Sequence, residues 1–355
     1  MAKRIYIARP RLDCSFKEGN KDKKKHISDE EGAPLGEIRV LMGQFIDRLA
    51  DYHIQRGDTV DKVTRPLWQF DLQEMQEISP KYDVVYFPHK LKRKFPIGKN
   101  ALYYKSSTLA EYITVDPEGW GAALSFLPVK PTPTKKAWPF YEHLRNRISS
   151  NQSTFPQPSA ANALLADNYL LFVCQIPHDE NILYQSDVTV EQALAAVIEY
   201  ARETNRTLIV KGHPVNPRSM APLKALAGKC ELAHWVDDVS IHTCLAGADR
   251  VFLVNSGVGF EAMFHGKTVV SFGRAEYSNV VVNAEPTIES LKACENETAN
   301  VEDYANFLYA FFQKTIRIND PASYERVLPP LIGNRRKPEL PLFKRISEYV
   351  SRRFG

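Results

Sequence analysis

The sequence predicts an α/β protein whose second half contains a parallel sheet, and three observations support this. After the first 168 residues, short apolar runs alternate with amphipathic helical segments, the pattern of parallel strands covered on both faces. The chain has 355 residues, more than one hydrophobic core usually supports, so two domains are expected. Ser149–Ser159 is polar, contains two prolines and predicts a linker. We place the domains at 1–155 and 156–335.

Composition narrows the class of protein. At 44% hydrophobic and 25% charged residues, the chain is typical of globular proteins. A net charge of +4 is too small to favour nucleic acid as a partner. The N-terminus lacks the apolar core of a signal peptide, and no apolar run is long enough to span a membrane, so we expect a cytoplasmic protein. Five scattered cysteines without C-x-x-C disfavour a disulfide framework or a structural zinc site.

Fewer elements are predicted in the first half than in the second. Two strands and two helices are expected, at Arg4–Ala8, Gly36–Gln55, Tyr82–His89 and Trp138–Ile148. Gly57 follows the first helix as a C-terminal cap would. Two basic loops, Lys21–Lys25 and Lys90–Lys94, either line a cleft for an anionic acceptor or lie in solvent.

The sequence of the second half predicts alternating strands and helices. Strands are expected at Tyr169–Pro177, Thr207–Pro214, Arg250–Ser256 and Thr268–Gly273. Helices are expected at Val190–Asn205, Asp238–Ala248, Gly259–Gly266, Val301–Ile316 and Pro341–Phe354. The last helix is basic and amphipathic, which favours a docking helix over one that lies on a membrane surface.

Polar residues follow four of these strands. Ligands of open α/β sheets gather at the carboxyl ends of the strands, so these positions are the candidate site. They are Gln175–Glu180, Lys211–His213, Asn255–Gly257 and Gly273–Tyr277.

One strand end is a glycine turn, Gly257-x-Gly259-x-x-Ala262, close to a dinucleotide fingerprint. Glycines let the backbone approach a phosphate, and the following helix offers free N–H groups. A nicotinamide cofactor, another phosphate and a turn without ligand are all compatible with it. The turn lies two-thirds along the chain, and Ser256 and Glu261 add polar groups that the fingerprint does not require, which disfavours nicotinamide.

Two other strand ends carry charged groups. Lys211 and His213 are two apart, so both side chains leave the strand on one face. This arrangement is compatible with a phosphate or carboxylate site, or with a surface histidine beside a solvated lysine. Asp179 follows Pro177 and is compatible with a general base, a nucleophile or a turn residue. No D-x-D motif occurs, which disfavours a metal-bridged diphosphate, and we expect no metal cofactor.

These motifs, in this order, resemble the bacterial capsule-polysaccharide synthesis glycosyltransferases, especially the retaining β-Kdo transferases. The matching motifs are Gln175-x-Pro177-x-Asp179, Lys211-x-His213-Pro214, Asn255-Ser256-x-x-Gly259-x-Glu261-Ala262 and Gly273-x-x-x-Tyr277. A weaker match covers Thr114–Ser125. The resemblance implies a GT-B fold: two Rossmann-like domains facing a cleft, with a C-terminal helix, here 336–355, crossing back to the first domain.

The resemblance also implies residue roles on the donor side, with CMP-Kdo as the donor. Asp179 matches the catalytic aspartate, a nucleophile in a double displacement, and His213 matches a histidine at the CMP phosphate or donor carboxylate. Ser256, Gly257 and Gly259 match the phosphate loop, and Glu261 matches a glutamate at the ribose. The other matched donor-side positions are Gln175, Lys211, Asn255, Gly273 and Tyr277.

On the acceptor side, a glycan or glycolipid is expected, and a second carboxylate should deprotonate its hydroxyl. Glu111 is the first candidate for this base and Asp116 the second, with Trp120 nearby. A peripheral position at the inner membrane and a partner transferase are open alternatives, and His178 and Glu180 have no assigned role. Other functions compatible with the motifs are transfer from another sugar nucleotide or a CDP-polyol, an NAD-dependent oxidoreductase, and a non-catalytic binding module.

Overall fold

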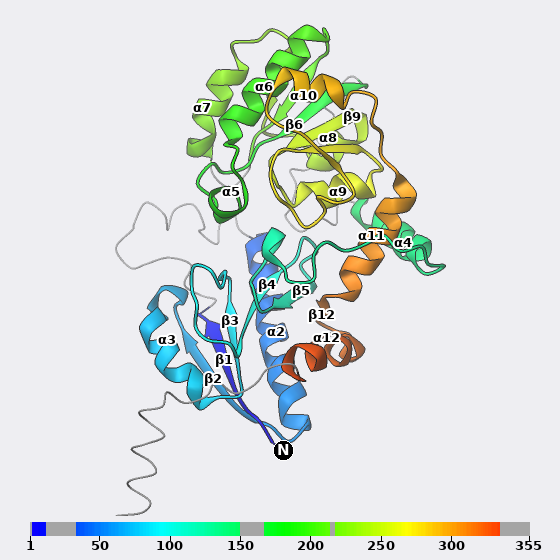
Figure 1. The fold of residues 1–355 in the computed structure, drawn as a ribbon. Helices are drawn as coiled ribbons and strands as arrows, with labels where there is room; N and C mark the ends of the chain where they lie inside the picture. The colour runs from blue at the N-terminus through cyan, green and yellow to red at the C-terminus, as the bar shows by residue number, and fades with distance from the viewer. Residues whose placement is uncertain (1, 12–32, 150–166, 214–216, 334–355) are drawn as a thin grey trace, which may run out of the picture.

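The computed structural model describes residues 2–11, 33–149, 167–213 and 217–333. They form two α/β units that lie end to end, each built on a six-stranded sheet (Figure 1). The predicted α/β class with two Rossmann-like domains is confirmed. Most of the expected linker and the basic loop Lys21–Lys25 fall outside the described residues.

The first sheet has the strand order β12-β5-β4-β3-β1-β2. Its central pairs are parallel, whereas β5 and β12 run antiparallel to their neighbours. The strands in chain order are β1 (Arg4–Pro10), β2 (Thr59–Arg65), β3 (Val84–Pro88), β4 (Ala101–Ser106) and β5 (Tyr112–Asp116). Short 3-10 turns are η1 (Leu67–Gln69), η2 (Ser79–Lys81) and η3 (Gly121–Ala123).

Two helices cover opposite faces of this sheet. Phe45 of α2 (Ala33–Gln55) packs with Ile5 and Ile7, whereas Met75 of α3 (Leu72–Ile78) packs with Tyr6. Successive residues of a strand point to opposite faces, so the apolar run of β1 supplies both cores.

Neither β2 nor β4 is predicted from the sequence. β2 reads TVDKVTR and has no fully buried residue, because it is the edge strand of the sheet and needs no apolar run. β4 has four buried residues followed by Lys105 and Ser106, a run too short to be separated from helix by pattern alone.

The second sheet is entirely parallel, with the order β11-β10-β9-β6-β7-β8. Its strands are β6 (Tyr169–Val173), β7 (Leu208–Lys211), β8 (Ala233–Val236), β9 (Ala248–Leu253), β10 (Thr268–Ser271) and β11 (Val282–Asn283). Its helices are α5 (Glu180–Gln185), α6 (Val190–Glu203), α7 (Pro217–Ala227), α8 (Ile241–Gly247), α9 (Val258–Phe264) and α10 (Ile288–Ala293). The amphipathic helix α6 begins at a capping box between Thr189 and Gln192.

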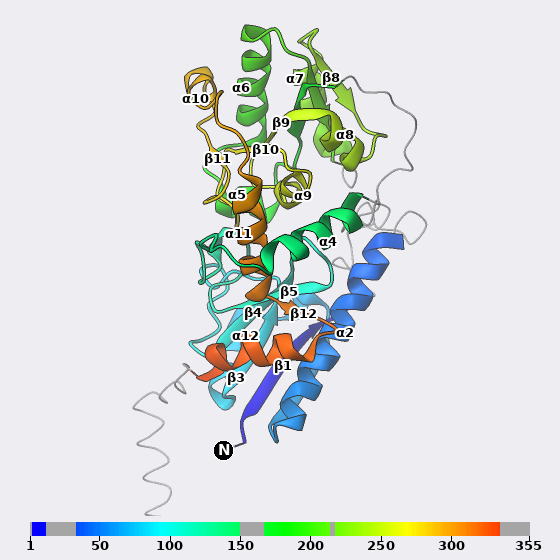
Figure 2. The same ribbon diagram turned by 90° about the vertical axis from the view of Figure 1, so that its right-hand side faces the viewer.

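The chain then returns to the first unit. α11 (Val301–Gln313) packs against α4 (Ala137–Ser149) at the junction of the units (Figure 2). β12 (Ile316–Arg317) pairs antiparallel with β5, and α12 (Pro321–Gly333) packs beside it.

The first residue of β12, Ile316, is fully buried in the core of the first unit. The return therefore begins well before residue 335, the expected end of the second domain. The apolar residues Ile316, Ile318, Tyr324 and Leu328 are the physical reason, because all four join the first core. The expected crossing-back helix 336–355 lies outside the described residues.

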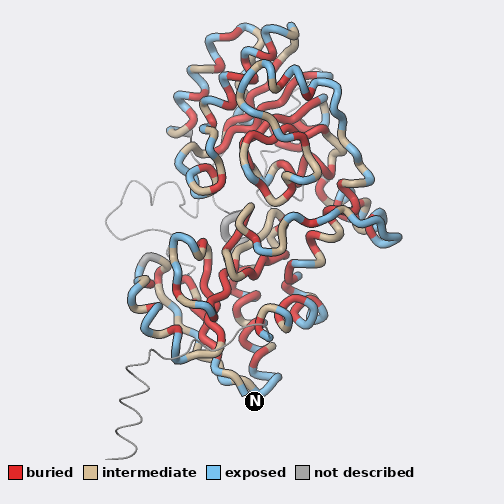
Figure 3. The backbone as a smooth tube through the Cα atoms, in the orientation of Figure 1, coloured by how far each residue is buried: buried red, intermediate tan, exposed pale blue. Residues whose placement is uncertain are grey.

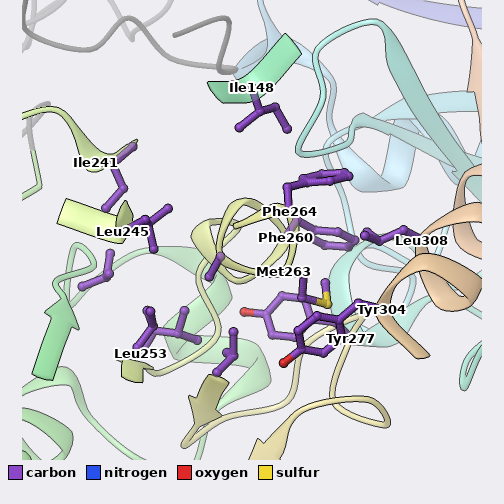
Figure 4. Packing of buried hydrophobic residues seen from close by; sticks show 14 of the residues in the cluster. Ile148, Ile241, Leu245, Leu253, Phe260, Met263, Phe264, Tyr277, Tyr304 and Leu308 are labelled. Atoms are coloured by element: carbon purple, nitrogen blue, oxygen red, sulfur yellow. The ribbon is translucent and has the colours of Figure 1, made fainter. Parts of the chain in front are cut away.

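One apolar core joins the units around α9. Figure 4 shows Phe260, Met263 and Phe264 of α9 among side chains from α4, α8 and α11. The same cluster includes Tyr112 of β5, whose ring centroid lies 4.6 Å from that of Phe312. The junction is thus a packed apolar contact, which holds the two sheets in a defined relation.

Burial follows the two sheets, whose strands form the buried centre of each unit (Figure 3). Four cysteines of the described chain, Cys174, Cys230, Cys244 and Cys294, are buried free thiols. Among the described helices, none has the length and apolar character needed to cross a bilayer.

Candidate functional site

The carboxyl ends of β10, β9, β6 and β7 lie side by side because these strands are neighbours in a parallel sheet. The predicted strand-end residues are therefore gathered at one edge, which faces the first unit (Figure 1). This is the edge at which open α/β sheets bind ligands.

Two of the predicted donor-side residues hold neighbouring loops together. Gln175 donates from Nε2 to Asn255 Oδ1 at 2.9 Å and accepts from the Asn255 backbone N–H at 2.9 Å. Asn255 also donates from Nδ2 to the carbonyl of Asn181 at 3.0 Å. Both amides are buried and engaged. Gln175 and Asn255 are thus placed to position the loop that precedes α5.

That loop carries Asp179, which caps α5. Its carboxylate accepts from the backbone N–H of Asn181 at 2.8 Å, and the side chain is exposed. His213, half-buried after β7, lies close enough that Asp179 raises its pKa. Burial is the larger effect and lowers the pKa of His213 overall, and Lys211 lowers it further. The structure thus brings Asp179, His213 and Lys211 together.

Lys211 is buried at the end of β7. Its ammonium donates to the carbonyl of Asp237 at 2.6 Å, which ties β7 to the segment after β8. Burial lowers the pKa of Lys211. Among the described residues, one hydrogen bond from the ammonium is found, and Lys211 lies close enough to His213 to affect its pKa.

The glycine turn between β9 and α9 is built on an aromatic support. Tyr277 is fully buried and donates from its hydroxyl to the carbonyl of Ser256 at 2.5 Å. Gly259 lies against this ring, because a Cβ there would come within 2.2 Å of it. Tyr277 therefore lies behind the turn and positions it. Gly273 similarly permits a close approach to Ser186, at 3.0 Å from where a Cβ would lie.

Glu261 is the notable group of α9. It is 7% exposed, and no hydrogen bond or ion pair is found for its carboxyl among the described residues. Burial raises its pKa to about 7. Such a carboxyl is costly to keep unless a ligand uses it.

The first unit contacts the site through α5. Gln185, which is buried, donates from Nε2 to the carbonyl of Trp120 at 2.9 Å and accepts from the N–H of Ala122 at 2.7 Å. Gly121 has φ +64 and lies so close to Gln185 that a Cβ would be 2.3 Å from Oε1. Arg93 of the basic loop also donates to the carbonyl of Tyr184. Both units therefore hold the helix that Asp179 caps.

The two predicted acceptor-side carboxylates are engaged by the protein. Glu111 forms an ion pair with Arg147 of α4. Asp116 is fully buried and accepts from the Glu118 N–H at 2.7 Å and from the Ser125 N–H at 2.9 Å and hydroxyl at 2.7 Å. Burial raises the pKa of Asp116, and the hydrogen bonds from Ser125 and Glu118 oppose it. Its bonds close the loop that carries Trp120.

Sequence reasoning missed Lys105, near the end of β4. Its Nζ lies 3.4 Å from the centroid of the Trp120 ring. Burial lowers the pKa of Lys105, whereas Asp179, Glu276 and Glu180 of the second unit raise it. Lys105 therefore faces the strand-end edge from the opposite unit. The polar residues at the end of an apolar run would have been the signal, but β4 itself was not predicted.

Two further titratable residues lie near Lys105. Burial lowers the pKa of His89 to about 3, and Lys105 and Lys90 lower it further. Burial raises the pKa of Glu276, and the charge of Lys105 lowers it. Glu276 lies in the strand-end segment Gly273–Tyr277, and the influence of Lys105 on its pKa indicates that it lies near the first unit. Among the described residues, no three His, Cys, Asp or Glu side chains are grouped as metal ligands.

Comparison with known proteins agrees with this arrangement. A family described as "Capsule polysaccharide biosynthesis protein" matches residues 144–319, which include every predicted donor-side residue. No curated protein matches the chain. A solved structure titled Thermosulfurimonas dismutans KpsC, beta Kdo 2,7 transferase, superposes with a TM-score of 0.51 at 14% identity over 86% of this chain and 89% of that one.

A second structure from Thermosulfurimonas dismutans, titled KpsC, beta Kdo 2,4 transferase, has a TM-score of 0.47 at 15% identity over 73% of this chain and 85% of that one. At such identities the 2,7 transferase structure supports the fold, and the family match supports the sequence resemblance. Residues 144–319, which carry the strand-end residues, match the capsule polysaccharide biosynthesis family.

Proposed function

We propose that the protein is a glycosyltransferase that moves Kdo from CMP-Kdo to a bacterial surface glycan or glycolipid, with retention of configuration. The observation that carries the proposal is the exposed carboxylate of Asp179, which caps α5, a helix whose other end is hydrogen-bonded to the first unit. The family match and the fold of the Kdo transferase structure support the class of reaction.

The chemistry suits an exposed, fixed carboxylate. In the first step, an oxygen of Asp179 attacks the anomeric carbon and the CMP phosphate leaves. In the second, the acceptor oxygen attacks the same carbon and releases Asp179, so two inversions give retention. The bond from Asp179 to the Asn181 N–H and the clamp at Gln185 hold the carboxylate in one position, which lowers the cost of reaching the transition state.

The leaving CMP has candidate partners on the donor side. His213 and Lys211 place positive charge at the strand ends, where the phosphate charge develops. Ser256 and Gly257 precede α9 and offer backbone N–H groups, whereas the N–H of Gly259 donates to the Ser256 carbonyl at 3.0 Å. The buried carboxyl of Glu261, for which no partner is found among the described residues, would accept hydrogen bonds from ribose hydroxyls.

The base that deprotonates the acceptor is a separate proposal. Glu111 and Asp116 were expected from the sequence, but the first is paired with Arg147 and the second is bonded to its own loop. Glu276 is a better candidate, because it faces Lys105 and its pKa is raised by burial. A carboxylate that holds a proton more strongly is a better acceptor for one.

Ligand binding tests the donor class. We expect CMP to raise the melting temperature, because a ligand that binds only the folded state stabilises it by about 2.7 kcal/mol at one hundred times its dissociation constant. UMP, CDP and NAD serve as the comparison. Stabilisation by NAD without stabilisation by CMP would overturn the proposal, and preference for CDP would indicate a polyol donor.

Replacement of Asp179 tests the nucleophile. Asp179→Asn keeps a helix-capping residue, so we expect loss of transfer with CMP binding retained. Asp71→Asn is the matched control, because Asp71 caps α3 in the same way, at the N–H groups of Gln73 and Glu74, outside the proposed site. Full transfer by Asp179→Asn would exclude the covalent route.

A further inference from the structure

We propose that Lys105 binds the carboxylate of the sugar that is transferred and thereby selects an acidic donor sugar. This rests on the proposed function, since it names the part of the donor that the first unit recognises.

The position of Lys105 is fixed from two sides. On one side, its Nζ lies 3.4 Å from the centroid of the Trp120 ring, and the carbonyl of Trp120 accepts from Gln185. On the other, Thr108 follows three residues later, and its Oγ1 is 3.3 Å from where a Cβ on Gly257 would lie. The end of β4 thus lies between the docked helix α5 and the glycine turn.

This position is close to the proposed reaction centre. Asp179 caps the end of α5 opposite to Gln185, and a helix of this length spans only about 9 Å. The charges of Asp179, Glu276 and Glu180 reach Lys105, as their effect on its pKa shows. Lys105 therefore faces the groups that surround the anomeric carbon in the proposed reaction.

The ammonium has donors to spare. Lys105 is half-buried, and within the described part of the chain it forms no ion pair with a carboxylate within 4.0 Å. Its described partner is the face of an indole, which attracts a cation without satisfying its N–H groups. A cation held on a rigid aromatic ring is preorganised to bind an anion.

The donor carries a suitable anion in a suitable place. In Kdo, the carboxylate is bonded directly to the anomeric carbon, so a residue that faces Asp179 also faces that carboxylate. The attack of Asp179 brings two carboxylates together, and a cation beside them offsets their repulsion. A neutral sugar would leave Lys105 without this partner, so the same contact discriminates against it.

The test compares the binding of CMP with that of CMP-Kdo by calorimetry, in an Asp179→Asn background that prevents turnover. Lys105→Met removes the charge and keeps the stem on Trp120, and Lys105→Arg keeps the charge. Lys62→Met, on the outer strand β2, is the control for loss of a lysine. We expect Lys105→Met to weaken CMP-Kdo about tenfold or more and to leave CMP within about twofold, because a charged hydrogen bond contributes roughly that much. Lys105→Arg should retain most of the affinity.

Three outcomes would overturn the inference. Equal weakening of CMP and CMP-Kdo by Lys105→Met would assign Lys105 to the phosphate or to the folding of the cleft. If Lys105→Met leaves the binding of CMP and CMP-Kdo unchanged but slows transfer in a protein with native Asp179, Lys105 acts on the acceptor. Failure of the protein with native Lys105 to bind either compound would overturn the donor assignment itself, and the inference with it.

Discussion

The buried carboxyl of Glu261 predicts a pH dependence of stability that is measurable without substrate. The perturbation is Glu261→Gln, which keeps the shape of the side chain and removes its ability to ionise. Glu261 is 7% exposed, and its pKa rises from 4.5 to about 7 on burial. The folded state binds the Glu261 proton more strongly than the unfolded state does. The contribution of this proton to folding stability is therefore complete below pH 4.5 and is lost as the pH rises through 7.

The magnitude follows from the shift. At 1.36 kcal/mol per pKa unit, a rise from 4.5 to about 7 corresponds to roughly 3 kcal/mol of differential stability, of which about 2.5 kcal/mol falls between pH 5 and pH 8. As the pH rises from 5 to 8, the free energy of unfolding of Glu261→Gln should therefore increase by about that amount relative to that of the wild type. The constant cost of burying an amide cancels when the two pH values are compared.

Urea unfolding followed by circular dichroism at pH 5 and pH 8 measures this difference. The exposed Glu302→Gln, on α11, is the control, because its carboxylate stays in water in the folded state. If the free energy of unfolding changes equally with pH in the wild type and in Glu261→Gln, the reasoning is refuted. If Glu261 also binds the nucleotide ribose, the variant that gains stability should lose affinity for CMP about tenfold.

Three further substitutions test the contacts of Gln185 and Gly121 and the burial of two histidines. Gln185→Leu leaves the N–H of Ala122 without its partner and removes one of two hydrogen bonds to the Trp120 carbonyl, so urea unfolding should show a loss of about 1 to 3 kcal/mol, and full stability would contradict the clamp. Gly121→Ala forces a residue at φ +64 against Gln185 and should lower the melting temperature and the activity together, with normal activity as the contrary result. Burial lowers the pKa of His265 and His242 to about 4, so their contribution is present above pH 6.5 and is lost as the pH falls toward 4. His265→Gln should make acid unfolding in that range less steep, and an unchanged acid limb would contradict this.

The gathering of the strand-end residues at one edge was predictable because it depends on the order of strands in the sheet. A parallel sheet brings its carboxyl ends to one edge, so Asp179, His213 and Glu261 could be grouped from their positions after three strands. The same reasoning predicted that Tyr277 binds the donor. In the structure Tyr277 lies behind the turn, because the missing Cβ of Gly259 lets the ring pack there. Sequence order shows which residues follow a strand, but it does not show which side of the turn they occupy.

The first-unit side of the site was harder to predict. The proposed role of Lys105 depends on its contact with Trp120 and on the docking of α5 from the second unit. These contacts join segments that are far apart in the sequence. Asp116 looked like an acceptor-side acid, yet its three hydrogen bonds close its own loop. Pairings of this kind depend on the final packing of both units, which no local pattern encodes.

The proposed mechanism requires that Asp179 forms a covalent bond to the transferred sugar. Intact-mass spectrometry of the Glu276→Gln variant, incubated with CMP-Kdo without acceptor, tests it most directly, because loss of the proposed base should slow release of the intermediate. We predict a mass increase of one Kdo residue that peptide mapping locates on Asp179 and that Asp179→Asn abolishes. Retained transfer by Asp179→Asn, with no adduct on the protein, would contradict the account.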